Sequence, residues 1–190
     1  MKIDKKILLR ELIQKVEENI NVLTQLEEIS NKQLTVTPAN GGWSIAQVIE
    51  HLNTYNAFYM PAIEQALKQA VIDKNYNIFK PGILGNYFVK MMQPQNGQVT
   101  KKYKAATRHI PGNAINAIVV LEIYLKGQQH LLQLLEIAAK YNINNIKIPT
   151  SISSIIKLKL GDVFRFLIVH QQRHFVQIEG ILKANKPQLV

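Results

Sequence analysis

The chain has 190 residues, which is enough for one substantial hydrophobic core and short for two, so we expect a single domain over residues 1–190. It has no cysteine, which excludes disulfides, thiolate metal ligands and a cysteine nucleophile. The formal net charge is +10, but the basic residues are dispersed, and no basic strip with interleaved aromatic residues of the nucleic-acid-binding kind accompanies them. We therefore assign most of this charge to solubility and do not expect nucleic-acid binding.

The longest apolar runs are too short to cross a bilayer, and the amino terminus mixes acidic and basic residues, unlike a signal peptide. We expect no membrane association and a cytoplasmic location.

The first half of the chain predicts two helices separated by a loop. Apolar residues at three- and four-residue steps predict an amphipathic helix over about 5–30. Proline and glycine in residues 32–42 predict a loop. The second helix begins after Ser44, which can form a capping box with Gln47, and it runs to about Ala70.

The periodicity weakens over residues 73–113, where seven prolines and glycines leave room for at most a short helix at about 84–92. A connection this long is often a lid or a pocket wall. It can equally be a crossover that lets two neighbouring helices run parallel.

The last third of the chain predicts two more helices. Residues 113–141 form an amphipathic pattern, residues 142–160 are irregular, and Asp162 can cap a final helix that ends near Lys183. Four long helices without strand alternation predict an all-α four-helix bundle with one long crossover between the second and third long helices. The apolar third helix offers a face for a homodimer.

Three histidines indicate a metal site. His170 and His174 are four residues apart and so share one helix face. Such a pair also arises by accident, and it lacks the glutamate of the zinc-protease motif. His51 leans inward from the second long helix, however, and inward imidazoles need partners. We interpret the three as ligands, with packing as the alternative, and expect ordinary roles for His109 and His130, which lack partners at ligand spacing.

Three neighbouring residues are candidates for a catalytic or binding role. Tyr55 either lines the pocket and donates a proton or belongs to the core, which aromatic residues at helical spacing more often do. Arg173 either receives the carboxylate of an anionic thiol cofactor or, as its place outside the apolar arc favours, forms a surface salt bridge. Gln171 either orients a water molecule in the pocket or packs in the core.

Two motifs resemble the DinB-like family. They are Gly-Trp-Ser-Ile-Ala-Gln at 42–47 leading to Glu-His-Leu at 50–52, and Gly-Asp at 161–162 leading to His-Gln-Gln-Arg-His-Phe-Val-Gln-Ile at 170–178. The resemblance implies a four-helix bundle that binds a divalent metal, commonly zinc or nickel, through His51, His170 and His174. Some relatives are implied to transfer a low-molecular-weight thiol such as bacillithiol to electrophilic substrates.

The chain departs from the family pattern after His51. Asn53, Thr54 and Asn56 stand where family members often have an acidic residue, and Glu50 is expected on the solvated face. A carboxylate that would fix the tautomer of an imidazole is therefore not evident.

The leading hypothesis is a metal-dependent enzyme, a thiol S-transferase or a hydrolase, acting on a small-molecule substrate. The alternative is a non-enzymatic metal-binding protein that serves a stress response or an interaction.

Overall fold

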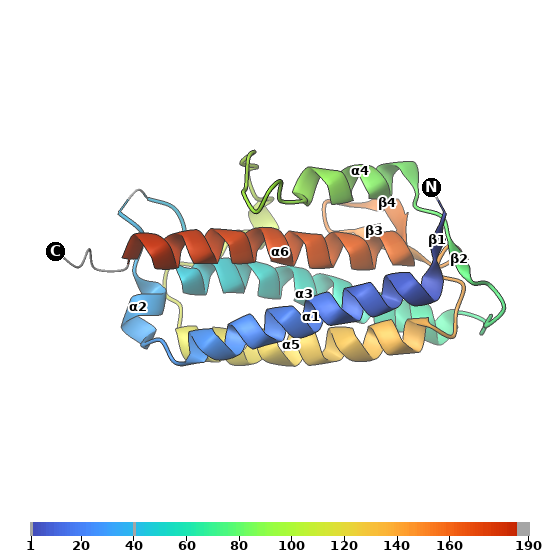
Figure 1. The fold of residues 1–190 in the computed structure, drawn as a ribbon, viewed down its shortest axis with the longest axis horizontal. Coiled ribbons are helices and arrows are strands. Elements are labelled where there is room, and N and C mark those ends of the chain that lie inside the picture. Colours follow the sequence, from blue (N-terminus) through green and yellow to red (C-terminus); the bar gives the residue numbers. More distant parts are fainter. Residues whose placement is uncertain (1, 40, 186–190) are drawn as a thin grey trace.

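The structure is a computed structural model that describes residues 2–39 and 41–185. Four long helices form a bundle: α1 (Lys5–Glu27), α3 (Ile45–Gln69), α5 (Ala117–Ala138) and α6 (Leu160–Asn185). In Figure 1, α1 and α6 run in one direction and α3 and α5 in the other. The all-α four-helix bundle is therefore confirmed. No helix in the described part of the chain combines the length and the apolar character needed to span a membrane.

The predicted start of the second long helix is confirmed in detail. The backbone N–H of Gln47 donates to Ser44 Oγ at 3.2 Å, and the backbone N–H of Ser44 donates to Gln47 Oε1 at 3.0 Å. This capping box satisfies backbone groups that the first helical turn leaves free, and so fixes where α3 begins. The loop expected at 32–42 is partly wrong, because a short helix, α2 (Asn31–Thr35), has a capping box of its own at Ser30.

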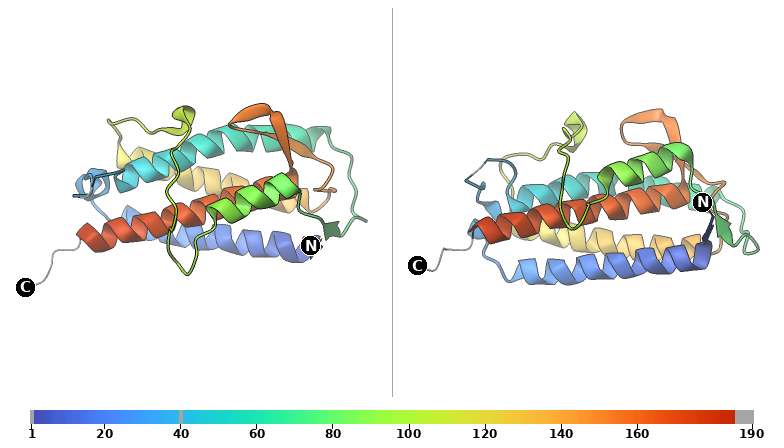
Figure 2. Two further views of the ribbon diagram at one scale, coloured as in Figure 1. Left: turned by 90° about the horizontal axis from the view of Figure 1, so that it is seen from above. Right: turned by 45° about the horizontal axis from the view of Figure 1, so that its top comes forward.

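The crossover segment, residues 70–116, connects α3 to the parallel neighbouring helix α5. It contains α4 (Ile83–Met92), which agrees with the short helix expected there, and a 3-10 turn, η1 (Thr107–His109). Figure 2 shows this segment passing over the bundle from the α6 side to the α3 side. Gly85 allows α4 to lie directly on α6, because a Cβ atom at this position would be 2.4 Å from the carboxyl carbon of Asp162.

The irregular structure expected at 142–160 is wrong. Strands β3 (Lys147–Thr150) and β4 (Ser153–Lys159) form an antiparallel hairpin in which Ile148 pairs with Leu158. These two paired side chains are the buried aliphatic residues of the strands. The alternation of apolar residues with lysine over residues 146–148 and 156–160 is the local signal that could have indicated the hairpin. A second two-stranded sheet pairs β1 (Ile3–Asp4) with β2 (Ile78–Phe79).

The predicted cap of the last helix is also wrong. The α6 helix already begins at Leu160, and Asp162 is buried in its first turn. Its carboxylate accepts hydrogen bonds from the backbone N–H of Gly82 at 2.8 Å and from Arg165 at 3.2 Å, so it binds the crossover segment to α6. Burial raises the pKa of Asp162, and the two hydrogen bonds oppose that rise.

The apolar core forms two clusters, and a polar layer lies between them along the bundle axis. One cluster includes Tyr59 of α3 and Ile168 of α6, and the other includes Leu52 of α3 and Phe175 of α6. The buried polar side chains at or next to this level of α3 and α6 are His51, Asn53, Asn56, His170, Gln171, Arg173 and His174. The two long helices therefore hold this group of polar side chains at one level of the bundle.

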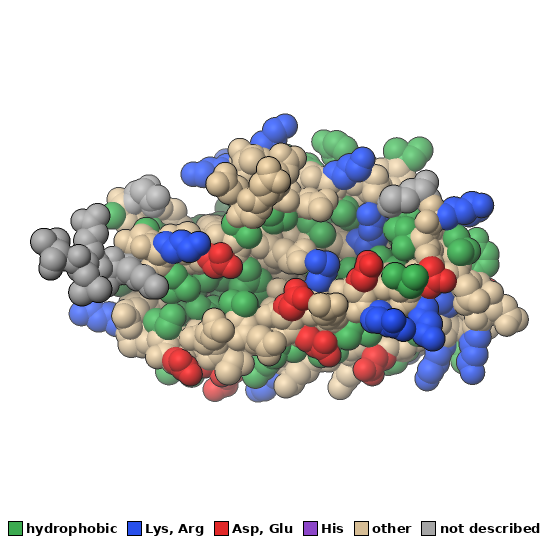
Figure 3. Space-filling view, viewed as in Figure 1, with side chains coloured by type: hydrophobic (Ala, Val, Ile, Leu, Met, Phe, Trp, Pro, Cys, Tyr) green, Lys and Arg blue, Asp and Glu red, His purple; other side chains and the backbone are tan. Residues whose placement is uncertain are grey.

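The solubility role expected for the net charge stays a prediction. On the face in Figure 3, basic and acidic side chains are interspersed over the long helices. The α5 helix exposes Ile118, Val119, Ile123 and Ile137. This apolar face is compatible with the expected homodimer, which stays a prediction.

Candidate metal centre

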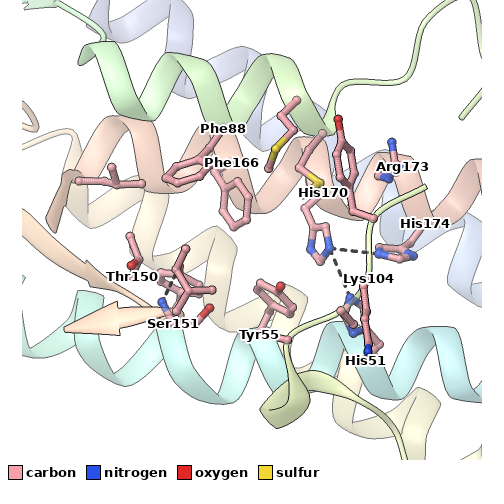
Figure 4. Close-up of a pocket in the computed structure, with 18 of the residues that line it drawn as sticks. His51, Tyr55, Phe88, Lys104, Thr150, Ser151, Phe166, His170, Arg173 and His174 are labelled. Atoms are coloured by element: carbon pink, nitrogen blue, oxygen red, sulfur yellow. Dashed lines mark hydrogen bonds between the residues drawn. The ribbon is translucent and has the colours of Figure 1, made fainter. Parts of the chain in front are cut away.

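The structure brings the three predicted histidines together. One ring nitrogen of each residue lies within 4.8 Å of those of the other two, although His51 is on α3 and His170 and His174 are on α6 (Figure 4). The distance from His170 Nε2 is 3.4 Å to His51 Nε2 and 3.0 Å to His174 Nε2. Nitrogen ligands at about 2.0–2.1 Å from a tetrahedral zinc ion lie roughly 3.3 Å apart, so the spacing fits a divalent ion.

Hydrogen bonds hold two of the imidazoles in the tautomer that a metal requires. His51 Nδ1–H donates to the backbone carbonyl of His109 at 2.6 Å, and His174 Nδ1–H donates to Gln177 Oε1 at 3.0 Å. Because both partners accept, the Nε2 lone pairs of these two rings are free to bind a cation. His170 Nδ1 has no hydrogen-bond partner among the described residues, so the proton of this ring can occupy either nitrogen.

A backbone carbonyl and a side-chain carboxamide therefore orient the imidazoles, which is the role that a neighbouring carboxylate often has in metal sites. The backbone oxygen of His109, a residue for which we expected an ordinary role, orients His51. No residue type in the sequence could have indicated this contact, since any residue at 109 has a backbone carbonyl. The spacing of His174 and Gln177, one helical turn apart, is the local signal that could have revealed the second contact.

Burial keeps the three rings neutral. Their exposed fractions are 3% for His51, 3% for His170 and 9% for His174. Burial lowers the pKa of His174 to about 3 and lowers the pKa values of His51 and His170 as well, with the neighbouring rings adding to the effect at His170 and His174. Neutral imidazole is the form that binds metal, so these ligands need no deprotonation at neutral pH.

The histidines lie at the wall of a cavity of about 340 Å³. Helices α3 and α6, the crossover segment and the β3–β4 hairpin all contribute side chains to it. The two alternatives left open for the long connection therefore hold together, since the segment is both a crossover and part of the cavity wall. No acidic side chain lines the cavity among the described residues. Its aromatic lining consists of Trp43, Tyr55, Tyr59, Phe88, Tyr103 and Phe166.

Tyr55 lies in this cavity beside the histidines. Its ring centroid is 4.4 Å from that of His170, and it stacks on the ring of His109 at 3.9 Å. Burial raises the pKa of Tyr55 to about 12, so the phenol remains protonated and can donate a hydrogen bond.

The other two candidates occupy different surroundings. Arg173 is not the surface salt-bridge residue that its position favoured: it is 8% exposed, it lines the cavity, and no described ion pair includes it. Its guanidinium donates to the carbonyl of Lys101 and lies 5.3 Å from the ring centre of Tyr103. Gln171 packs in the core, where its Oε1 accepts from Asn19 Nδ2 at 2.9 Å, and it is not among the cavity-lining residues.

The fold and the site together define a helical-bundle protein with a candidate three-histidine metal centre beside an apolar cavity. The sequence profile of the DinB superfamily matches residues 13–178, and the chain belongs to this superfamily. Comparisons with curated proteins and with solved structures found no match.

Proposed function

We propose that this protein is a metal-dependent enzyme whose divalent ion, zinc or nickel, is held by His51, His170 and His174 and activates a thiol or a water molecule. The supporting observation is the convergence of three neutral imidazoles at the wall of a cavity large enough for a small molecule. Structural zinc sites normally have four protein ligands. Three ligands that all line a cavity are typical of a catalytic centre, which leaves a position for the substrate.

A divalent ion bound there would act as a Lewis acid and lower the pKa of a thiol or a water molecule that it coordinates. The protein supplies the orientation of the ligands through the His109 carbonyl and Gln177. The aromatic side chains that line the cavity would limit the access of bulk water to the reacting groups. The protonated phenol of Tyr55 can donate a hydrogen bond to negative charge that develops on a substrate or leaving group.

The chemistry of the lining favours thiol transfer over hydrolysis. No carboxylate lines the described cavity, so the nucleophile must lose its proton without a carboxylate as general base. A free thiol has a pKa of roughly 8.5, whereas that of bulk water is about 15.7, so a thiol needs much less assistance.

Metal analysis tests the ligand assignment. We expect about one zinc or nickel ion per chain in the purified, untagged protein, and loss of both metal and turnover in His174→Ala with the bundle still folded. Helical circular dichroism monitors the fold. Stoichiometric metal in the folded His174→Ala variant would show that the assignment is wrong.

A thiol and electrophile screen on the metal-loaded protein separates the enzyme from the alternative. The lack of an acidic residue beside the histidines in the described cavity favours, as a second candidate, a metal-binding protein without enzymatic activity. Turnover that depends on both metal and thiol supports the enzyme. Full metal occupancy without turnover over a broad panel supports the second candidate.

A further inference from the structure

Arg173 is a buried cation without an anionic partner. Its side chain is 8% exposed, and no described carboxylate lies within ion-pair distance of it. One guanidinium nitrogen donates to the backbone carbonyl of Lys101, which satisfies one donor and leaves the charge uncompensated. Burial lowers the pKa of Arg173, although arginine keeps its charge at neutral pH. A buried charge normally has a partner, so the missing one is expected to come from a ligand.

The cavities on both sides of Arg173 are basic. The main cavity is also lined by Lys104. A second cavity of about 230 Å³ shares Arg173 and Tyr103 with the first and adds Lys90 and Lys101. No acidic residue lines either cavity among the described residues. An anion near Arg173 therefore meets attraction from both sides and no repulsion from a lining carboxylate.

The opposite part of the main cavity is apolar. Phe88 from α4, Phe166 from α6 and Leu158 from the β3–β4 hairpin line it. Figure 4 shows Phe88 and Phe166 together on one side of the histidines and Arg173 on the other. The cavity volume of about 340 Å³ lies at the low end of the range for small-molecule sites. The space thus suits an apolar body of two or three rings.

We propose that the cavity binds an organic anion with an apolar body, whose carboxylate, sulfonate or phosphate group contacts Arg173 while its rings or branched chain lie near Phe88 and Phe166; Lys104 adds a further positive charge to the same cavity. The histidines lie between these two ends, so the middle of such a molecule faces the candidate metal centre. That this anion is the substrate rests on the proposed enzymatic function. Binding of the anion needs only the cavity and its cations.

A matched pair of fluorescent probes tests the proposal. The probes are 1-anilinonaphthalene-8-sulfonate and N-phenyl-1-naphthylamine, which share the same rings and differ in the sulfonate. Trp43 is the only tryptophan of the chain and lines the cavity, so quenching of its fluorescence reports occupancy at this site. We expect the sulfonate probe to bind roughly ten-fold more tightly than the neutral probe, the size of one charge-assisted hydrogen bond.

Variants assign the effect to the two cations. Arg173→Gln should weaken the sulfonate probe roughly ten-fold and leave the neutral probe within about two-fold. Lys104→Gln should act in the same direction by about three-fold, because its exposed side chain is better solvated. The exposed Lys126→Gln on α5 is the control and should change neither affinity. If Arg173→Gln does not fold, Arg173→Lys and Lys104→Gln provide the test.

Competition distinguishes the anionic groups. 2-Naphthoate and 2-naphthyl phosphate should displace the sulfonate probe, the stronger competitor identifying the preferred group, and neutral 2-naphthamide should not. Equal binding of the two probes to the wild-type protein, or equal weakening of both in Arg173→Gln, would overturn the proposal.

Titrations on zinc-loaded and chelator-treated protein separate this proposal from the metal centre. Discrimination between the probes in a protein that binds no metal would leave the anion site standing and refute the metal centre. A protein that binds metal but binds both probes equally would refute the anion site and leave the metal centre standing.

Discussion

The hydrogen bond between His174 and Gln177 allows a sharp test of the metal centre. The other orienting contact uses a backbone carbonyl, which no substitution removes, whereas Gln177→Leu deletes the acceptor at 3.0 Å from His174 Nδ1. Leucine is as good a helix former as glutamine, so α6 should be unaffected. The variant therefore isolates the effect of orientation on metal binding.

The expected magnitude follows from the surroundings of Gln177. Loss of such a partner typically weakens metal binding 10–100-fold, on the order of 1.4–2.8 kcal/mol. Gln177 is only half-buried, so water can partly replace its carbonyl oxygen. We therefore expect about ten-fold weaker zinc binding for Gln177→Leu. Gln177→Glu should bind more tightly than the wild type, since a charged acceptor forms the stronger hydrogen bond.

Competition with a chromophoric zinc chelator at pH 7.5 measures these affinities. Gln172→Leu is the matched control, because it makes the same change on the same helix at a residue outside the cavity lining. Wild-type affinity in Gln177→Leu, or equal weakening in the control, would refute the role given to this hydrogen bond.

Two further predictions concern stability. In the metal-free protein burial lowers the pKa of His174 from 6.5 to about 3, so between these values the unfolded chain binds a proton that the folded chain does not. Stability should thus fall as the pH falls below about 6.5, by about 2 kcal/mol at pH 5 for this residue. Thermal melts of chelator-treated protein should show a shallower loss for His174→Gln, and an identical slope would contradict the assignment. Gly85→Ala should destabilise the fold by about 1–3 kcal/mol in urea, because the new Cβ would lie 2.4 Å from the Asp162 carboxyl carbon. Gly180→Ala, a helical position with open space around it, should stabilise by about 0.5–1 kcal/mol, and a shift of both variants in the same direction would contradict this packing of α4 on α6.

Local patterns in the sequence determined the bundle and the metal candidates. A capping box depends on residues three apart, and Ser44 and Gln47 form it as predicted. The shared face of His170 and His174 likewise follows from the helical period, which neighbouring helices do not alter. The inward lean of His51 came from the apolar stripe of a single helix.

Only the tertiary structure decided what surrounds these groups. Helical periodicity located Arg173 outside the apolar arc of its own helix, but the crossover segment lies over that flank, so the guanidinium is buried against Lys101 and Tyr103. Asp162 has the residue type of a helix cap, yet it binds Gly82, eighty residues away in the chain. The sequence pattern of an element reports which side faces the core of the bundle. It does not report which irregular segment covers the other side, because that depends on contacts between residues far apart in sequence, and those contacts leave no period to detect.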